Sequence, residues 1–239
     1  MYDQKKIAIY LTDVWGEDEL SKFDDYAQKF ELMLSPHMPN TKFEHFNVME
    51  GNFPSNPTDY DGVVITGSKA YVTDKSPWME QLFHHIRILD AARIKIFAVC
   101  FGHQAVALAL GGSVNHQPLM LGVTKFDIIK QKEWMQPKAE SLKLHAGNFQ
   151  QVTKLSSDMQ LIAQNQQCLN AMVIKDNHIL TLQFHPELSA KYMHHYIDDV
   201  EHKIDPELIT NARKQVDMGA DGDIFAKWAA TFLSDLQPH

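Results

Sequence analysis

The sequence predicts an α/β fold, with a central, mostly parallel sheet flanked by helices and a smaller antiparallel sheet. Short apolar runs alternate with longer amphipathic segments through the first half of the chain, whereas short turns separate the apolar runs of the second half. Strands that alternate with helices form parallel sheets covered on both faces. Strands joined by short turns pair in the antiparallel sense. These two observations together predict the fold class.

Four strands are expected in the first half, where four short runs are rich in β-branched and aromatic residues. They are residues 6–11, 43–48, 62–67 and 94–99. Three helices are expected beside them. Residues 19–34 repeat apolar side chains at helical spacing, and residues 77–90 place a proline near the first turn, where proline is favoured. Residues 105–110 are rich in Ala and Leu and end at a Gly-Gly pair, which stops a helix.

The second half is expected to add four strands and two helices. The strands are residues 123–130, 151–155, 171–175 and 179–184, and the helices are residues 191–200 and 224–236. No repeat, low-complexity tract or linker interrupts the chain. We therefore expect a single domain over residues 1–239, with residues 191–239 as a C-terminal helical extension.

Composition narrows the class of protein. The 239 residues are 44% hydrophobic and carry a formal net charge of −8, which argues against nucleic acid or an anionic membrane as a partner, since both reward clustered Lys and Arg. No apolar run approaches the roughly 20 residues that span a bilayer, and the first is too short for a secretory signal. The two cysteines are therefore expected to be free thiols in the cytoplasm.

Cys100 stands at a predicted strand-to-helix corner, directly after the apolar run 94–99. Ala98 and Gly102 complete the pattern small-x-nucleophile-x-small, in which small neighbours permit a tight turn that presents the nucleophile. The start of the following helix favours a thiolate, and it makes the Phe101 N–H a candidate oxyanion donor. A buried structural cysteine is the alternative, and this segment alone does not decide between the two.

His185 offers the best setting for a base that would serve this nucleophile. It ends the apolar run 179–184 and is followed by Pro186 and Glu187. The proline keeps its predecessor extended, and residues two apart on an extended chain point the same way, so Glu187 is placed to fix the tautomer of the ring. A strand-end turn with a solvated glutamate is the alternative. His185 and Glu187 together favour a triad of cysteine, histidine and glutamate.

Other site chemistries fit less well. His194 and His195, with His202, suggest a metal, but no His-Glu-x-x-His or Cys-x-x-Cys frame is present, so neither a metal nor a cofactor is expected. An α/β-hydrolase with a cysteine elbow would place its acid well before the histidine, whereas Glu187 follows it. No Gly-x-Gly-x-x-Gly motif follows a strand, which disfavours a dinucleotide enzyme.

Three motifs in order resemble those of the class I glutamine amidotransferases, whose glutaminase uses a Cys-His-Glu triad. They are residues 63–78, the elbow Cys-Phe-Gly-His-Gln from Cys100, and His-Pro-Glu from His185. The resemblance covers roughly residues 5–190 and is greatest to stand-alone members similar to the glutaminase domain of GMP synthetase and to γ-glutamyl peptidases. It implies a flavodoxin-like class I glutaminase fold.

The resemblance also implies a role for each matching residue. Cys100 would be the nucleophile, His185 the general base and then acid, and Glu187 the orienting carboxylate. Gly67 and Phe101 would supply the oxyanion N–H groups, and Gln104 would line the substrate pocket. The implied reaction is attack of a thiolate on a γ-carboxamide, which gives a γ-glutamyl thioester that water then hydrolyses.

Two segments depart from the family pattern. The family's Gly-Gly-Pro-like turn is Thr66-Gly67-Ser68 here. In the family's His-x-Asp segment, Asn148 and Gln150 stand in the places of the histidine and the aspartate. A neutral side chain recognises the α-ammonium group of a substrate more weakly than a carboxylate does. The motifs therefore predict the bond that is cleaved and leave the substrate open between glutamine and a γ-glutamyl compound.

The predicted function is hydrolysis of a γ-glutamyl amide in a small molecule. These 239 residues contain no Gly-x-x-x-x-Gly-Lys-Ser/Thr motif, and we expect no acceptor domain among them. The alternatives are a glutaminase subunit that delivers ammonia to a separate synthetase, and a non-catalytic binding protein on the same fold.

Overall fold

A mixed sheet forms the centre of the structure, a computed structural model that describes residues 4–234. The strands are β1 (Lys5–Leu11), β2 (Thr41–Asn47), β3 (Gly62–Ile65), β4 (Lys95–Val99), β5 (Ser113–Ile128), β6 (Ser141–Lys154), β7 (Met159–Gln164), β8 (Met172–Lys175) and β9 (Ile179–Leu182). The helices are α1 (Glu17–Lys22), α2 (Tyr26–Leu34), α3 (Pro77–Ala91), α4 (Phe101–Ala109), α5 (Ala190–Val200), α6 (Pro206–Asp217) and α7 (Gly222–Ser234). Within the described residues the strands form one nine-stranded sheet.

The sheet changes from parallel to antiparallel at β9. Its strand order is β2-β1-β3-β4-β9-β8-β7-β5-β6. The strands from β2 to β9 pair in parallel, whereas the pairs from β9 to β6 are antiparallel. The antiparallel strands expected in the second half are present, and the pairing of β8 with β9 joins them to the parallel part.

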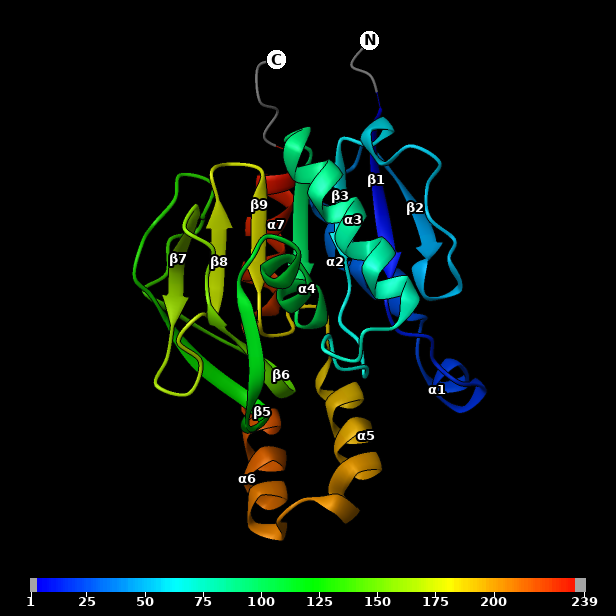
Figure 1. The fold of residues 1–239 in the computed structure, drawn as a ribbon. Helices are drawn as coiled ribbons and strands as arrows, with labels where there is room; N and C mark the ends of the chain where they lie inside the picture. Colours follow the sequence, from blue (N-terminus) through cyan, green and yellow to red (C-terminus); the bar gives the residue numbers. More distant parts are fainter. Residues whose placement is uncertain (1–3, 235–239) are drawn as a thin grey trace.

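Helices cover both faces of the parallel strands (Figure 1). Along β1, Ile7 and Ile9 face the core beneath α2 and α7, and Ala8 and Tyr10 face the core beneath α3 and α4. This alternation follows from the two-residue period of a strand and explains why the buried strands are apolar on both sides. The predicted α/β architecture is confirmed.

Some predicted elements have different limits. The helix predicted over 19–34 is split, because the Asp25 side chain accepts the Gln28 N–H at 2.8 Å and starts a new helix there. Strands β5 and β6 begin earlier than predicted, and β7 and α6 were not predicted. The early part of β5 is polar and exposed, and its register with β6 shifts between His116 and Met120, so it lacks a regular apolar period. Residues 235–236 of the last predicted helix lie outside the described residues.

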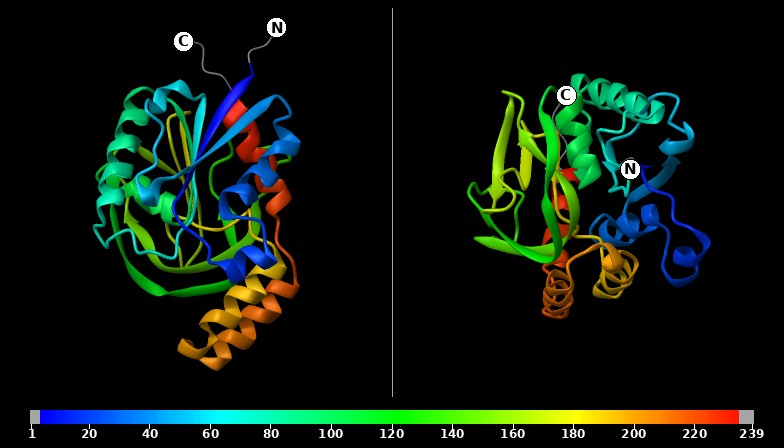
Figure 2. Two further views of the ribbon diagram at one scale, coloured as in Figure 1. Left: turned by 90° about the vertical axis from the view of Figure 1, so that its right-hand side faces the viewer. Right: turned by 60° about the horizontal axis from the view of Figure 1, so that its bottom comes forward.

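The parallel strands end at the edge of the sheet where the predicted site residues lie. Gly67, Cys100 and His185 follow β3, β4 and β9, and ligands of open α/β sheets bind outside such carboxyl ends. Helices α5 and α6 pack together and extend the molecule beyond this edge (Figures 1 and 2). Over residues 4–234, no helix has both the length and the apolar character needed to cross a membrane.

Candidate active site

Cys100 occupies a strained corner between β4 and α4. Its backbone φ is 51° and its ψ is −103°, a conformation that costs a non-glycine residue about 1–3 kcal/mol and that is concentrated at functional sites. The corner is held by hydrogen bonds from the Cys100 N–H to the Leu182 carbonyl at 2.8 Å and from the Gln104 N–H to the Cys100 carbonyl at 3.1 Å. A Cβ on Gly102 would lie 2.6 Å from the Ile65 carbonyl oxygen, so only glycine lets α4 approach β3 this closely.

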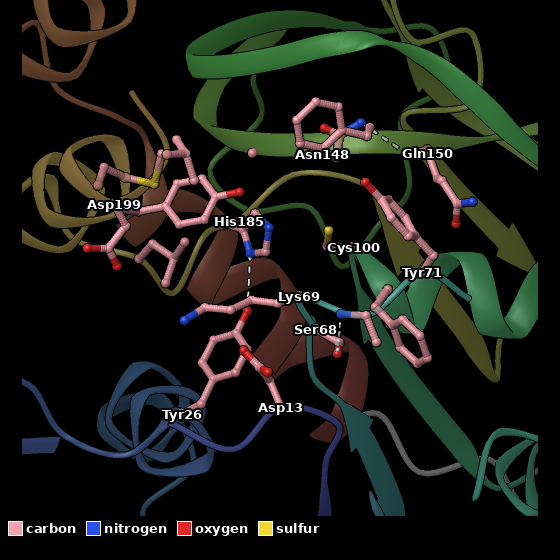
Figure 3. A pocket seen from close by; sticks show the side chains of 18 of the residues that line it. Asp13, Tyr26, Ser68, Lys69, Tyr71, Cys100, Asn148, Gln150, His185 and Asp199 are labelled. Carbon is pink, nitrogen blue, oxygen red and sulfur yellow. Dashed lines mark hydrogen bonds between the residues drawn. The ribbon is translucent and has the colours of Figure 1, made fainter. Parts of the chain in front are cut away.

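His185 and Glu187 form a buried pair beside this corner. Nδ1 of His185 lies 2.7 Å from Oε1 of Glu187, and the glutamate side chain is fully buried. The backbone of His185 is fixed by its N–H, which donates to the His145 carbonyl at 2.8 Å. Since Nδ1–H donates to the carboxylate, Nε2 is left for Cys100, which acts on the charge of the ring. Figure 3 shows the Cys100 sulfur beside this histidine.

The charges of this group favour a protonated histidine. Burial by itself would lower the pKa of His185, but the Glu187 carboxylate and a thiolate at Cys100 outweigh it and raise the pKa to about 10. An imidazolium between two anions stabilises both of them. The arrangement is therefore suited to a thiolate–imidazolium pair, which is the reactive form of a cysteine nucleophile.

Gly67 is held against the same group. The Thr66 carbonyl accepts the Gly102 N–H at 3.2 Å and the Thr12 hydroxyl at 3.0 Å. Because a trans peptide places its N–H opposite its carbonyl, the Gly67 N–H points away from these donors. A Cβ on Gly67 would lie 2.5 Å from the Tyr26 hydroxyl oxygen and 3.0 Å from Cε1 of His185, so the position has no room for a side chain.

Phe101 and Gln104 lie in the first turn of α4. Phe101 lines the pocket, and its buried ring stacks on Trp78 with centroids 5.4 Å apart. The Gln104 Nε2 donates to the Gln150 carbonyl at 2.7 Å and to Oε1 of Gln183 at 3.1 Å. Gln104 lines the pocket, but its amide hydrogens already tie α4 to β6 and to the segment after β9.

A pocket of about 440 Å³ opens next to Cys100 (Figure 3). Residues 147–150 of β6 form one wall, and residues 68–71, which follow the Gly67 turn, form another. Helix α5 and the segment after it close the far side, where the lining is largely apolar. The apolar residues there are Leu188, Tyr192, Met193, Tyr196, Val200 and Ile204, and Asp199 and Lys203 add two charged groups.

Asn148 and Gln150 present unpaired acceptors in the β6 wall. Their amide nitrogens are paired, with the Gln150 carbonyl at 3.2 Å and the Thr73 hydroxyl at 2.8 Å respectively. Oδ1 of Asn148 and Oε1 of Gln150 are buried and have no hydrogen-bond partner among residues 4–234. Buried acceptors without partners are costly. Both oxygens are closed to solvent in this arrangement, so N–H groups of a ligand would pair with them only after the side chains turn toward the pocket.

Two further residues of this site have no sequence signal. Tyr26, at the start of α2, donates its hydroxyl hydrogen to Oε1 of Glu187 at 2.9 Å, although the two residues are 161 positions apart. Asp13, just after β1, is a buried carboxyl group in the pocket wall, and burial, more than any neighbouring charge, raises its pKa to about 6. Neither residue belongs to a recognisable motif, and only the folded topology brings them to the pocket.

One group of potential metal ligands occurs in the described part of the chain. It consists of Glu19, His195 and Asp199, whose ligand atoms lie within 4.8 Å of one another. The Glu19 carboxylate, however, is already engaged by the Lys69 ammonium at 2.5 Å and by the Gly16 N–H at 3.2 Å. His195 lies in this group, whereas the His194 ring is paired with Asp217 at 2.8 Å.

Comparison with known proteins identifies the family. The model of the family described as glutamine amidotransferase class-I matches residues 34–202, so the chain belongs to the class-I glutamine amidotransferase family. It is 28% identical over 210 residues to γ-glutamyl peptidase 4 of Arabidopsis thaliana, an alignment that covers 84% of this chain and 82% of that protein. The motif-based family prediction is thereby confirmed, and the chain is an enzyme of the amidotransferase or hydrolase type.

Solved structures share the fold at low sequence identity. A glutamine amidotransferase from Thermotoga maritima superposes with a TM-score of 0.75 at 17% identity, covering 97% of this chain and 99% of that one. The glutaminase domain of Trypanosoma brucei CTPS, solved with bound acivicin, gives a TM-score of 0.57 at 15% identity and covers 77% of this chain and 87% of that one. These likenesses show the class I glutaminase fold.

Proposed function

We propose that the chain hydrolyses a γ-glutamyl amide bond with Cys100 as the nucleophile. One observation carries the proposal: a cysteine on a strained corner adjoins a histidine whose Nδ1 lies 2.7 Å from a fully buried glutamate. A nucleophile, a base and an orienting carboxylate in this order are the parts that acyl transfer through a covalent intermediate requires.

The first half of the reaction forms a thioester. The Cys100 thiolate attacks the γ-carbonyl carbon, a C–S bond forms, and the oxyanion is held by the N–H groups of Gly67 and Phe101. The His185 imidazolium gives its Nε2 proton to the leaving nitrogen as the C–N bond breaks, and the amine or ammonia departs.

The second half regenerates the enzyme. Neutral His185 takes a proton from water, and the resulting hydroxide attacks the thioester carbonyl. The C–S bond breaks, glutamate is released, and the thiolate–imidazolium pair is restored. Glu187 keeps the ring oriented through both halves by holding Nδ1–H.

The pocket supports a substrate larger than free glutamine. Its volume of about 440 Å³ lies within the roughly 300–1,000 Å³ range of pockets that hold drug-sized ligands. The orphaned oxygens of Asn148 and Gln150 suit the α-ammonium end of a γ-glutamyl group, although more weakly than carboxylates would. The apolar wall formed by α5 is then left for the amine side of the substrate.

The test is glutamate release by the purified chain from glutamine and from a panel of γ-glutamyl peptides. Cys100→Ala is expected to abolish release, and Cys168→Ala is the matched control. Cys168 is a buried thiol whose pKa burial raises to about 12, so it should not react. Equal release by wild type and Cys100→Ala would exclude the proposal.

A glutaminase subunit for a separate synthetase is the second candidate. The structural likeness to the glutaminase domain of CTPS favours it. Such a subunit should release little glutamate alone and should gain activity with its acceptor. A non-catalytic binding protein would show neither activity, and its Cys100 would be alkylated no faster than Cys168.

A cytoplasmic location forms part of the proposal. Cys100 and Cys168 are both unpaired, as expected where thiols are kept reduced. Fractionation of cells that express the tagged chain tests this: recovery outside the cytoplasmic fraction would contradict it.

A further inference from the structure

Tyr26 brings a third group to the candidate His185–Glu187 pair. Its hydroxyl donates to Oε1 of Glu187 at 2.9 Å, and the same oxygen accepts Nδ1–H of His185 at 2.7 Å. Oε2 of Glu187 is buried and has no hydrogen-bond partner within residues 4–234. Both hydrogen bonds of the carboxylate therefore converge on one oxygen, and Tyr26 supplies one of them.

The tyrosine cannot replace the glutamate as the partner of the histidine in this geometry. Its hydroxyl oxygen is 3.4 Å from Nδ1 of His185, farther than the carboxylate oxygen is. Since the Nδ1 hydrogen goes to Glu187, Nδ1 has no lone pair left to accept the phenol. Tyr26 therefore lies against the histidine (Figure 3), but its shorter hydrogen bond is the one to Glu187.

An aromatic stack fixes the ring that carries this hydroxyl. The Tyr26 ring stacks on Trp15 with centroids 5.2 Å apart and an interplanar angle of 18°. Trp15 in turn stacks on Tyr192 of α5 at 4.7 Å and 5°. Because Tyr26 is buried and stacked on a tryptophan that Tyr192 also holds, the Tyr26 ring has little freedom to move its hydroxyl away from the glutamate.

The opposite side of the hydroxyl is bounded by the candidate oxyanion turn. An added Cβ at Gly67 would lie 2.5 Å from the Tyr26 oxygen, so the glycine leaves the space that the phenol fills. Burial, followed by the charges of Glu187 and Cys100, raises the pKa of Tyr26 well above its ordinary value. The phenol therefore stays protonated and remains a donor.

We propose that Tyr26 is a positioning residue that fixes the Glu187 carboxylate and, through it, the orientation of His185. The inference rests on the proposed function of the same site. It predicts that removal of the hydroxyl alone loosens the carboxylate from Nδ1, while the ring at position 26 keeps its place in the pocket lining.

The titration of His185 reports on this role. The groups that act on it are Cys100, Glu187 and His145, and of these the Glu187 carboxylate and the Cys100 thiolate hold the imidazolium. Beyond them, Tyr192 and Lys29 interact with Glu187. Loosening of Glu187 removes one of the charges that raise the pKa of His185, so this pKa should fall when the Tyr26 hydroxyl is removed.

The experiment compares Tyr26→Phe with Tyr10→Phe. Tyr10 is a matched control because it is also buried, its hydroxyl lies 3.3 Å from Nδ1 of His85, and it packs in the core on the other face of the sheet. For each variant, the rate of Cys100 alkylation by iodoacetamide is measured from about pH 5 to about pH 11, and kcat and KM are measured on the best γ-glutamyl substrate.

Tyr26→Phe is expected to lower kcat by about 10- to 100-fold, the effect of losing a hydrogen bond to a charged group, and to change KM by less than about twofold. The basic limb of the alkylation profile is the change in rate at high pH that follows the deprotonation of His185. Its midpoint should move down by about half a pH unit or more. Tyr10→Phe should change neither. An unmoved or raised basic limb, or a Tyr26→Phe variant as active as Tyr10→Phe, would overturn the proposal.

The two proposals can fail separately. Alkylation needs no substrate, so a chain that releases no glutamate still reports whether Tyr26 acts on the His185–Glu187 pair. Conversely, Cys100-dependent glutamate release with an unchanged profile in Tyr26→Phe would leave the proposed function intact and reject the role of Tyr26.

Discussion

Substitution of Gly67 by alanine is the perturbation that the structure predicts most sharply. The new Cβ would lie 2.5 Å from the Tyr26 hydroxyl oxygen, nearly an ångström short of the 3.4 Å at which ordinary contact begins. The tyrosine cannot simply withdraw, because its ring is stacked on Trp15 and its hydroxyl is bonded to Glu187 at 2.9 Å. The Gly67→Ala variant must therefore displace groups of the candidate triad.

The expected cost is that of overpacking a filled site. It amounts to about 1–3 kcal/mol of unfolding free energy. For a chain of this size that lowers Tm by roughly 2–12 °C. The activity should fall as well, because the second neighbour of the new methyl group is Cε1 of His185 at 3.0 Å.

Removal of the Tyr26 hydroxyl should relieve part of this cost, while the contact of the new Cβ with Cε1 of His185 at 3.0 Å remains. The next tyrosine atom, Cζ, would lie 3.5 Å from the new Cβ, which is an ordinary contact. Gly67→Ala in a Tyr26→Phe background is therefore expected to cost about 1 kcal/mol less than Gly67→Ala alone, a favourable coupling of the kind seen between touching residues.

Urea unfolding of the wild type, the two single variants and the double variant measures this coupling. Gly16→Ala is the steric control, since an added Cβ there meets nothing within 4 Å. Gly16 is the N-cap of α1, where alanine is less favourable, so a loss of up to about 1 kcal/mol is expected from the cap alone. If Gly67→Ala were as mild as Gly16→Ala, or as costly with Tyr26→Phe as without it, the packing argument would be wrong.

Three further predictions concern the charged groups of the site. Glu187→Gln should lower kcat less than His185→Ala does, because the base remains and only its orientation suffers; equal losses in steady-state kinetics would contradict this. Activity should persist as pH rises above the ordinary pKa of histidine and should decline only as pH approaches about 10, since the pKa of His185 is raised to about that value; a pH–rate profile that declines near 7 would oppose it. Burial raises the pKa of Asp13 from 3.8 to about 6, so the native state loses stability as pH rises through this interval. Asp13→Asn removes this loss and should stabilise the fold at pH 7 by about 1–3 kcal/mol. Thermal melts at pH 4 and pH 7 test this, since the gain should vanish at the lower pH.

The sequence was most informative where a local pattern has one structural meaning. The apolar run before Cys100, the small residues around it and the His-Pro-Glu motif each act through neighbours in the chain, and the structure brings Cys100, His185 and Glu187 to one place. The parallel half of the sheet followed from the same kind of pattern, because buried strands are apolar on both sides.

Features that depend on distant contacts could not be predicted. Tyr26 reaches Glu187 across 161 positions, and nothing in its own segment distinguishes it from a core tyrosine. For Gln104 the motif predicted only the place beside the pocket. Its hydrogen bond to the Gln150 carbonyl depends on how β6 folds back against α4, which the motif does not show. The first part of β5 was missed because its exposed polar residues carry no apolar period.

The proposed reaction is tested most directly by trapping its intermediate. The enzyme is mixed with a γ-glutamyl peptide, quenched in acid within the first turnover, and analysed as intact protein and as peptides by mass spectrometry. The account predicts a mass increase of one γ-glutamyl group on the peptide that contains Cys100, which disappears as glutamate is released and is absent from Cys100→Ala. Glutamate release that continues in Cys100→Ala with no adduct at any time would contradict it.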